Sequence, residues 1–215
     1  MTLNLFADTA GSRGEPLYAG AVLLRNFATP KAQRLFDALN RITVEAPFRH
    51  MQTPGGFRMS VAMTNCGSCG WVADRNGYRY ARKDPESGQP WPRMPAVFLE
   101  LAKGAAASAG FDDFEPDACL VNRYEPGARL SLHQDKDERD LDSPVVSISL
   151  GIPAVFLFGG LRRSDRPLRL ALAHGDAVVW GGPSRLRYHG IAPLRDDCHF
   201  LFGRCRINLT FRKAF

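Results

Sequence analysis

Residues 206–212 read RINLTFR, and the strict alternation of polar and apolar residues predicts a β-strand with two different faces. The apolar face, formed by Ile207, Leu209 and Phe211, belongs in a hydrophobic core. The other face carries two cationic and two neutral polar side chains, namely Arg206, Asn208, Thr210 and Arg212. Either this face lies in water on an edge strand, or it points into a barrel, where buried guanidinium groups need anionic partners.

The spacing of the two arginines favours one kind of anion. Arg206 and Arg212 are six residues apart, which is roughly 20 Å along an extended strand. Long side chains that lean toward each other shorten this separation to several ångströms, which suits a short dicarboxylate. Because an arginine can hold a carboxylate through two parallel hydrogen bonds, the pair would form a strong and directional clamp.

The chain before this strand is rich in other short strands. From residue 117 onward, short apolar stretches are separated by turns that contain Gly and Pro. These stretches predict strands at 118–124, 128–135, 145–150, 155–158, 168–173, 177–180, 186–191 and 205–212. Many short strands of even spacing in one domain indicate a sandwich, a barrel or a jelly roll.

Two helices are predicted ahead of these strands. The first should begin near residue 29, with Thr29 as its N-cap. The second should run from about 95 to 109 and end at Gly110. Residues 1–27 are expected to be irregular, with a strand at 21–25.

Residues 48–92 have a different texture, in which Gly and Pro are frequent and Met, Trp and Tyr are scattered. This pattern predicts short strands and loops that form a lid or binding lobe, as opposed to a core layer. There is no internal repeat and no clear linker. We therefore expect one domain over residues 1–215, with the lid inside it.

The composition limits the class of protein and its compartment. A hydrophobic content of 45% and a charged content of 23% are typical of a globular protein. The N-terminus has no basic region followed by an apolar run, and no stretch suits a membrane span, so we expect a cytoplasmic protein with no membrane partner. The net charge of +6 fits a polyanionic partner, but it fits an arginine-rich proteome equally well.

The five cysteines give little functional information. An odd number without a signal peptide indicates reduced thiols. Cys66 and Cys69 have the spacing of zinc ligands, but no second pair completes a set of four, and we assign them no role.

A metal site is indicated by RLSLHQDKDE, residues 129–138. On a strand, His133 and Asp135 project from the same face, so both can bind one divalent ion. His189 in RLRYHGI supplies a third ligand, and two histidines with one carboxylate form the facial triad of non-haem Fe(II) oxygenases. Taken alone, the pattern also fits an exposed histidine beside a solvated acid. The remaining histidines are assigned to surface or turn positions: His50, His174 and His199.

The segment LVNRYEPG adds Asn122 and Tyr124, which share a face and can give neutral hydrogen bonds to the same ligand. The ordered set Asn122-x-Tyr124, His133-x-Asp135, His189 and Arg206-x-Asn208-x-Thr210-x-Arg212 closely resembles the AlkB family. These are Fe(II)- and 2-oxoglutarate-dependent dioxygenases that repair alkylated nucleic acids. The likeness extends from TPGGFRMSVAMTNCG through VVWGGPSRLRYHGI to the terminal strand, which is most of the chain.

The resemblance implies a mainly β fold with flanking helices (α+β), namely a double-stranded β-helix or jelly roll with a nucleotide-recognition lid at 48–92. It implies that Fe(II) is bound by His133, Asp135 and His189. It also implies that Arg206 and Arg212 bind the two carboxylates of 2-oxoglutarate, in an order that the sequence leaves open. Asn122, Tyr124 and Asn208 would assist them, and dioxygen is the other cosubstrate.

The activity implied is oxidative demethylation of bases such as 1-methyladenine and 3-methylcytosine in DNA, and also in RNA. Formaldehyde, succinate and CO2 are released, and the alkylation damage is reversed directly. The base must be flipped out or single-stranded to reach such a pocket.

Four residues match family contacts to the substrate. Trp71 matches the residue that stacks on the damaged base opposite His133, and Asp137 matches an acid near the polar edge of the base. Tyr78 and Arg163 match nucleotide contacts. Weaker candidates for the pocket lining are Thr53, Met63, Arg129, Gln134 and Lys136.

Two other functions fit the same residues. One is a demethylase that acts mainly on RNA or free nucleotides, because the same base edge would serve. The other is a non-catalytic, cupin-like metal-binding module. The paired arginines weigh against it, since a passive barrel has no need of a dicarboxylate clamp. Nothing in the sequence indicates an oligomer, and we expect a monomer.

Overall fold

Strand β13 (Arg206–Arg212) lies inside a large antiparallel sheet, which excludes the alternative of an edge strand in water. A computed structural model describes residues 14–215, and β13 pairs there with β6 (Ala118–Tyr124) and β8 (Val145–Gly151). Residues 1–13, which belong to the segment expected to be irregular, lie outside the described residues. The sheet has seven strands in the order β1-β2-β11-β8-β13-β6-β3. The other strands are β1 (Glu15–Tyr18), β2 (Ala21–Leu24), β11 (Ala177–Trp180) and β3 (Ala62–Gly67).

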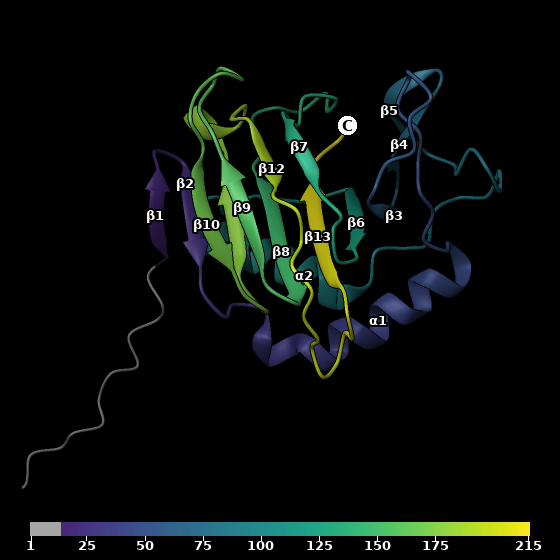
Figure 1. Cartoon of the computed structure of the whole chain (residues 1–215), viewed down its shortest axis with the longest axis horizontal. Coiled ribbons are helices and arrows are strands. Elements are labelled where there is room, and N and C mark those ends of the chain that lie inside the picture. Colours follow the sequence, from purple (N-terminus) through teal and green to yellow (C-terminus); the bar gives the residue numbers. More distant parts are fainter. Residues whose placement is uncertain (1–13) are drawn as a thin grey trace, which may run out of the picture.

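A second antiparallel sheet faces the first (Figure 1). Its order is β10-β9-β12-β7, formed by β10 (Leu168–Leu172), β9 (Ala154–Phe158), β12 (His189–Ile191) and β7 (Leu130–His133). Between the sheets, the rings of Phe156, Phe158 and Trp180 contact one another and form part of a buried core. The two facing sheets make a double-stranded β-helix, which confirms the predicted jelly roll.

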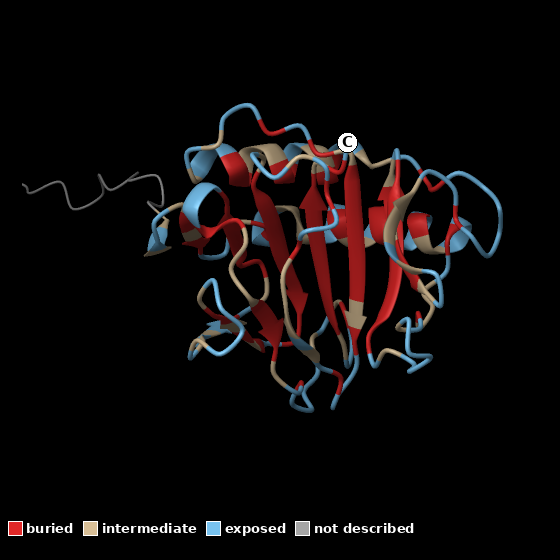
Figure 2. Ribbon diagram, turned by 90° about the horizontal axis from the view of Figure 1, so that it is seen from above, coloured by how far each residue is buried: buried red, intermediate tan, exposed pale blue. Residues whose placement is uncertain are grey.

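Both helices cover the outer face of the large sheet. Helix α1 (Ala32–Glu45) and helix α2 (Ala96–Ser108) lie on one side of a layer of buried strands (Figure 2). Leu209 of β13 belongs to the core cluster that these helices share with the sheet, and Phe211 packs edge-on against Phe98 of α2. Gly110, which has a φ of +86°, follows the end of α2 as predicted.

Several predicted boundaries shift by one residue, and β1 forms in a segment expected to be irregular. The other larger differences lie at Thr29 and at strands β7 and β12. Thr29 lies inside a short 3₁₀ turn, η1 (Thr29–Lys31), and its hydroxyl donates to the carbonyl of His174 at 3.4 Å. The N-cap assignment of Thr29 is therefore wrong, because a tertiary contact takes its hydroxyl. Strands β7 and β12 are shorter than predicted, because their shared ladder ends where His133 meets His189.

Residues 48–92 do not behave as one unit. Strand β3 pairs with β6 and is covered on both faces, so it belongs to the core layer. Strands β4 (Gly70–Asp74) and β5 (Gly77–Ala81) form a separate two-stranded hairpin, which stands beside the barrel in Figure 1. This hairpin and the loops around it are the part of the predicted lid that lies apart from the main sheets.

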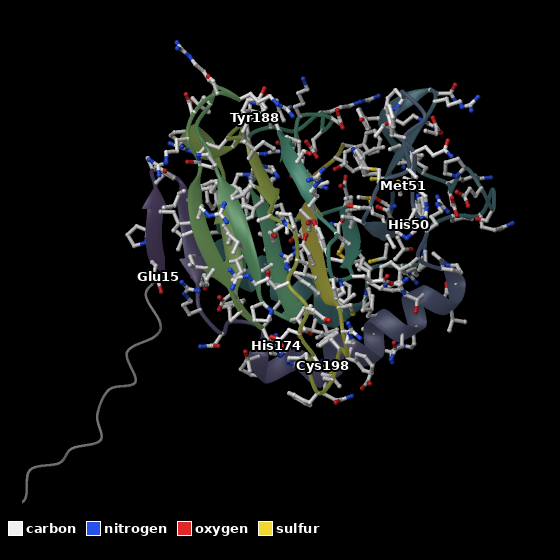
Figure 3. All side chains as sticks on the ribbon, in the orientation of Figure 1. Glu15, His50, Met51, His174, Tyr188 and Cys198 are labelled. Carbon is white, nitrogen blue, oxygen red and sulfur yellow. The ribbon has the colours of Figure 1, made fainter. Side chains whose placement is uncertain are left out.

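The two ends of the barrel differ in what they carry. Tyr188 lies at one end, and His174 lies with Cys198 at the other (Figure 3). The ring of His174 contacts that of His199, with centroids 4.3 Å apart, and accepts a hydrogen bond from the amide of Gly151. Within residues 14–215, no helix combines the length and apolar character needed to cross a membrane.

Candidate active site

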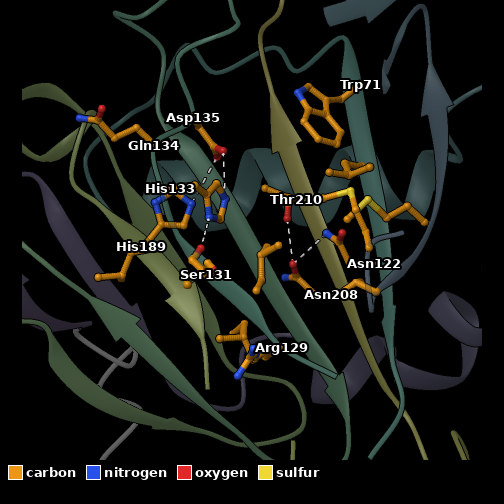
Figure 4. Close-up of a pocket in the computed structure, with 18 of the residues that line it drawn as sticks. Trp71, Asn122, Arg129, Ser131, His133, Gln134, Asp135, His189, Asn208 and Thr210 are labelled. Atoms are coloured by element: carbon orange, nitrogen blue, oxygen red, sulfur yellow. Dashed lines mark hydrogen bonds and ion pairs between the residues drawn. The ribbon is translucent and has the colours of Figure 1, made fainter. Parts of the chain in front are cut away.

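The three predicted metal ligands meet at the mouth of the barrel (Figure 4). His133 ends β7 and lies directly across the ladder from His189, the first residue of β12. Asp135 follows two residues after β7 ends, and its two oxygens lie 3.7 Å from the Nε2 atoms of His133 and His189. Two atoms that bind one ion at about 2.1 Å are at most about 4.2 Å apart, so both pairs fit a shared metal.

Backbone carbonyls orient both imidazole rings. Nδ1 of His133 lies 2.9 Å from the carbonyl oxygen of Ser131, and Nδ1 of His189 lies 3.0 Å from that of Arg187. Because a carbonyl can only accept, each Nδ1 carries the proton and each Nε2 keeps its lone pair for a metal. Burial lowers the pKa of His189 to about 4, so this ring is neutral near pH 7.

Arg212 holds the carboxylate ligand in its ionised form. Its Nε and Nη2 atoms donate to Oδ2 of Asp135 at 2.8 and 2.7 Å. Burial alone would raise the pKa of Asp135, but the Arg212 guanidinium and the two imidazoles outweigh it and hold the pKa far below its usual value. A fixed carboxylate with two imidazoles whose Nε2 atoms face it is a donor set that fits Fe(II).

Arg206 is in a different situation, although it points from the same face of β13. Its side chain is 1% exposed, and only Nη2 has a partner, the hydroxyl of Ser149 at 2.8 Å. Within residues 14–215, Nε and Nη1 have no hydrogen-bond partner and no carboxylate pairs with this guanidinium. Burial accordingly lowers the pKa of Arg206. A buried cation with free donors is a built site for an anion.

Neutral polar groups fill the sheet between the two arginines. Asn208 donates to the hydroxyl of Ser147 at 2.8 Å and accepts from Thr210 at 2.9 Å. Asn122 on β6 donates to the same Asn208 oxygen at 3.3 Å. Ser147 and Ser149 were not among the predicted site residues, although they alternate with apolar residues in VVSISLG, a pattern that places both on one face of the strand.

One pocket of about 730 Å³ gathers every predicted site residue. It is lined by the iron and 2-oxoglutarate candidates His133, Asp135, His189, Asn122, Tyr124, Arg206, Asn208 and Arg212. It is also lined by the substrate candidates Trp71, Tyr78, Asp137 and Arg163, and by Thr53, Met63, Arg129, Gln134 and Lys136. The volume has room for a small diacid and a nucleobase together.

An aromatic pair stands at the rim of this pocket. The rings of Trp71 and Tyr78, on opposite strands of the β4–β5 hairpin, stack with centroids 5.6 Å apart and planes 11° apart. The indole Nε1 of Trp71 donates to Oδ2 of Asp137 at 2.8 Å. The other oxygen of Asp137 has no contact of this kind within the described part of the chain.

Cys66 and Cys69 lie away from the pocket in apolar clusters. Burial raises the pKa of Cys69 to about 12, so its thiol stays protonated. Among the described residues, the group of potential metal ligands that lie together is His133, Asp135 and His189, so this pair lacks the further ligands of a zinc site.

The comparisons with known proteins agree with this geometry. Residues 20–212 match the model of the 2OG-Fe(II) oxygenase superfamily. The alpha-ketoglutarate-dependent dioxygenase AlkB of Escherichia coli K12 is 59% identical to the chain, over 99% of this chain and 98% of that protein. The chain belongs to the AlkB family. It is close to bacterial AlkB, as its motifs predict.

More distant AlkB relatives share the fold. A solved structure, "The structure of OsALKBH1", matches with a TM-score of 0.81 and 29% identity, over 93% of this chain and 99% of that one. The DNA N(6)-methyladenine demethylase ALKBH1C of Arabidopsis thaliana is 31% identical over 94% of this chain and 50% of that protein. As an AlkB-family dioxygenase, the protein uses Fe(II) with 2-oxoglutarate (alpha-ketoglutarate) and O2, and the His–Asp–His set fits the metal.

Asp135→Asn is expected to weaken divalent metal binding by about 100-fold or more, because even the loss of a group that only orients a ligand costs about 10–100-fold. Mn(II) binding measured by calorimetry checks this. The fold should survive, since Glu138 remains as a carboxylate partner for Arg212. Asp142→Asn, an exposed acid beyond the pocket, is the matched control and should bind Mn(II) normally. Equal affinity in both variants would contradict the metal assignment.

Proposed function

We propose that this enzyme removes methyl groups from ring nitrogens of bases in alkylated DNA, by hydroxylation with 2-oxoglutarate and O2. The observation that carries the proposal is the stacked pair of Trp71 and Tyr78 at the rim of the pocket that contains the metal ligands. Every nucleobase has a flat π-face, so an aromatic rim beside an oxidising metal suits a base as substrate. The 59% identity to E. coli AlkB supports it, as does the similarity to a plant DNA N(6)-methyladenine demethylase.

The two arginines are proposed to take different carboxylates of 2-oxoglutarate. Arg212 already touches the metal ligand Asp135, so it lies near the carboxylate next to the keto group, which is the metal-binding end. Arg206 has free donors and lies at the other end of β13, so it would anchor the distal carboxylate. Its guanidinium also lies over the ring of Tyr124, at 5.0 Å from the centroid. Asn122 and Asn208 would complete this polar floor.

When bound, Fe(II) couples the decarboxylation of 2-oxoglutarate to hydroxylation of the N-methyl group, which then leaves as formaldehyde while the base is restored. The protein residues do the positioning. Arg212 keeps Asp135 ionised and directed at the metal, and the two carbonyl-bound imidazoles present Nε2. Phe156 and Trp180 line the pocket and are buried, so they give part of its inner wall an apolar surface.

The base is proposed to lie between Trp71 and the ring of His133. Asp137 has one oxygen engaged by Trp71 and a second one toward the polar edge of the base. A carboxylate there would favour a cationic methylated base, such as 1-methyladenine or 3-methylcytosine, over its neutral parent. The base must leave the duplex stack to arrive, so single-stranded DNA is the easier substrate.

Exposed basic groups at the rim are proposed to contact the sugar–phosphate backbone. Arg129, Lys136 and Arg163 are exposed and line the pocket, and the chain has a net charge of +6. Such contacts position a strand without reading its sequence, so RNA with the same methylated base is the second candidate substrate. We further propose a monomeric, cytoplasmic enzyme, where its five free cysteines would remain reduced.

The direct test is turnover of methylated oligonucleotides with Fe(II) and 2-oxoglutarate. We expect succinate and formaldehyde in equal amounts from single strands with 1-methyladenine or 3-methylcytosine, and little formaldehyde from the unmethylated strand. Matching RNA strands decide between DNA and RNA. Formaldehyde release that is the same without 2-oxoglutarate would rule the mechanism out.

Trp71→Ala should weaken binding of a methylated single strand by about 5- to 150-fold, since stacking on an aromatic side chain is worth about 1–3 kcal/mol per base. Trp71→Phe keeps a ring and should lose less. Fluorescence anisotropy of a labelled oligonucleotide measures both. Affinity for Mn(II) and 2-oxoglutarate should change far less than DNA affinity in each variant, because the contact between Tyr80 and Glu138 remains. Equal DNA affinity in wild type and Trp71→Ala excludes the stacking role.

Arg206→Met should have opposite effects on stability and on binding. Removal of an unpaired buried charge should raise the free energy of unfolding of the ligand-free protein by about 1–4 kcal/mol. The same change should weaken 2-oxoglutarate binding about 30-fold or more, because a carboxylate would lose its buried partner. Denaturant unfolding and calorimetry measure the two effects. Arg204→Met, at an arginine side chain that is 66% exposed, should change neither. Weaker stability with unaltered binding would refute the anchor role.

A further inference from the structure

A buried ion network connects the metal ligand Asp135 to the β4–β5 hairpin. Arg212 donates to Asp135 and also lies 3.3 Å from Oε1 of Glu138. The hydroxyl of Tyr80, on β5, donates to the same Oε1 at 2.6 Å and lies 3.5 Å from Nη1 of Arg212. Arg185 closes the network, since it pairs with Oε2 of Glu138 at 3.2 Å and donates to the backbone carbonyl of Asp135 at 2.6 Å.

The hairpin contacts the loop after β7, residues 134–138, at two neighbouring points; this loop carries Asp135 and is called the metal loop below. Trp71 and Tyr80 are direct partners across the β4–β5 ladder, so their side chains lie on the same face of the hairpin. Trp71 donates to Asp137 and Tyr80 donates to Glu138, the next residue along the chain. Two adjacent attachments fix the orientation of the hairpin as well as its distance from the metal loop.

Glu138 and Tyr80 act from outside the pocket. Neither side chain lines it, and Glu138 and Arg212 are each only 6% exposed. Glu138 therefore has no direct access to substrate or cosubstrate and can influence the metal ligand Asp135 only through the side chains it contacts, Arg212 and Arg185. Hydrogen bonds between ionised partners in such a dry environment are among the strongest in proteins, so the network transmits displacement firmly.

We propose that Tyr80 and Glu138 are positioning residues that couple the β4–β5 hairpin to the metal site through Arg212. Occupation of the metal site acts on the carboxylate that Arg212 holds, and the hydroxyl of Tyr80 passes this constraint to the hairpin that bears Trp71. Coupling of this kind is reciprocal. If metal and cosubstrate binding favours the attached hairpin by some factor, loss of the attachment to Glu138 must lower the affinity for metal and cosubstrate by that same factor. The inference rests on the proposed metal and 2-oxoglutarate site but not on the nature of the nucleic acid.

The test uses Tyr80→Phe, which removes one hydroxyl and keeps the ring that packs beside Cys69, Ala118 and Ala214. Amide hydrogen exchange of residues 70–81 is measured with and without saturating Mn(II) and 2-oxoglutarate, a pair that permits no turnover. In the wild-type protein, loading should slow exchange of the hairpin. In Tyr80→Phe that protection should disappear, and the Kd for Mn(II) in the presence of 2-oxoglutarate should rise about 5- to 10-fold.

Arg79→Gln is the matched control, because it breaks the exposed Arg79–Asp74 pair of the same hairpin and leaves the network untouched. If Arg79→Gln weakens the hairpin only locally, amide hydrogen exchange of the hairpin should be faster by the same factor in the loaded and the unloaded protein. The Kd for Mn(II) should be unchanged. Tyr80→Phe with full protection on loading and a wild-type Kd would overturn the proposal. So would an Arg79→Gln variant that loses the coupling to the same extent.

The outcome can be separated from a failure of the metal site itself. If Asp135→Asn binds Mn(II) like the wild type, the metal assignment fails and the coupling has no basis. If Asp135→Asn loses Mn(II) while Tyr80→Phe behaves as wild type, the site stands and only the coupling is refuted. Glu138→Gln keeps an acceptor for Tyr80 but removes the charge that faces Arg212. It should therefore weaken Mn(II) binding in a folded protein, and normal binding would also count against the proposal.

Discussion

Strand β13 is buried on both faces, and one of those faces carries two guanidinium groups. Buried charge must be compensated, and the surrounding structure is arranged to do this in two different ways. At one end of the strand, Arg212 is met by Asp135 and Glu138. At the other end, Arg206 is met by the hydroxyl of Ser149 and the ring of Tyr124, and no carboxylate within residues 14–215 pairs with it. The metal ligand, the cosubstrate pocket and the contact with the hairpin all follow from these two solutions.

The incomplete compensation of Arg206 is a cost to the ligand-free fold that a carboxylate ligand removes. A protein selected only for stability would have an apolar residue in place of Arg206, or an acid beside it. Arg212 has such acids, namely Asp135 and Glu138. The pocket instead offers free donors in a dry environment, where a diacid is held more firmly than in water. The Arg206 guanidinium therefore lowers the stability of the ligand-free protein and raises its affinity for the cosubstrate.

The sequence predicted the features that depend on the local spacing of residues. It missed those that depend on contacts between residues far apart in the chain. The i, i+2 spacing divided β13 into two faces, because that relation holds within one strand. It also placed His133 near Asp135, although β7 ends at His133 and Asp135 lies in the loop that follows. Arg206 and Arg212 have the same side chain, so the sequence predicts the same role for both. In the folded chain, Asp135 pairs with Arg212 and not with Arg206. Tyr80 and Arg185 gave no signal, since each reaches Glu138 across many residues. The local sequence suits Thr29 as an N-cap, but its hydroxyl instead donates to the carbonyl of His174 in a distant turn.

The direct pairing of His133 with His189 has a consequence for assembly of the small sheet. Side chains alternate between the faces of a strand, so a slip of one residue between β7 and β12 would turn one imidazole away from the other. Only the native alignment then offers both nitrogens to a cation. Since a ligand that binds one arrangement increases its population, a divalent ion present during folding favours correctly aligned strands over slipped ones. Metal binding thus selects the native strand register of the sheet that supplies the two histidine ligands.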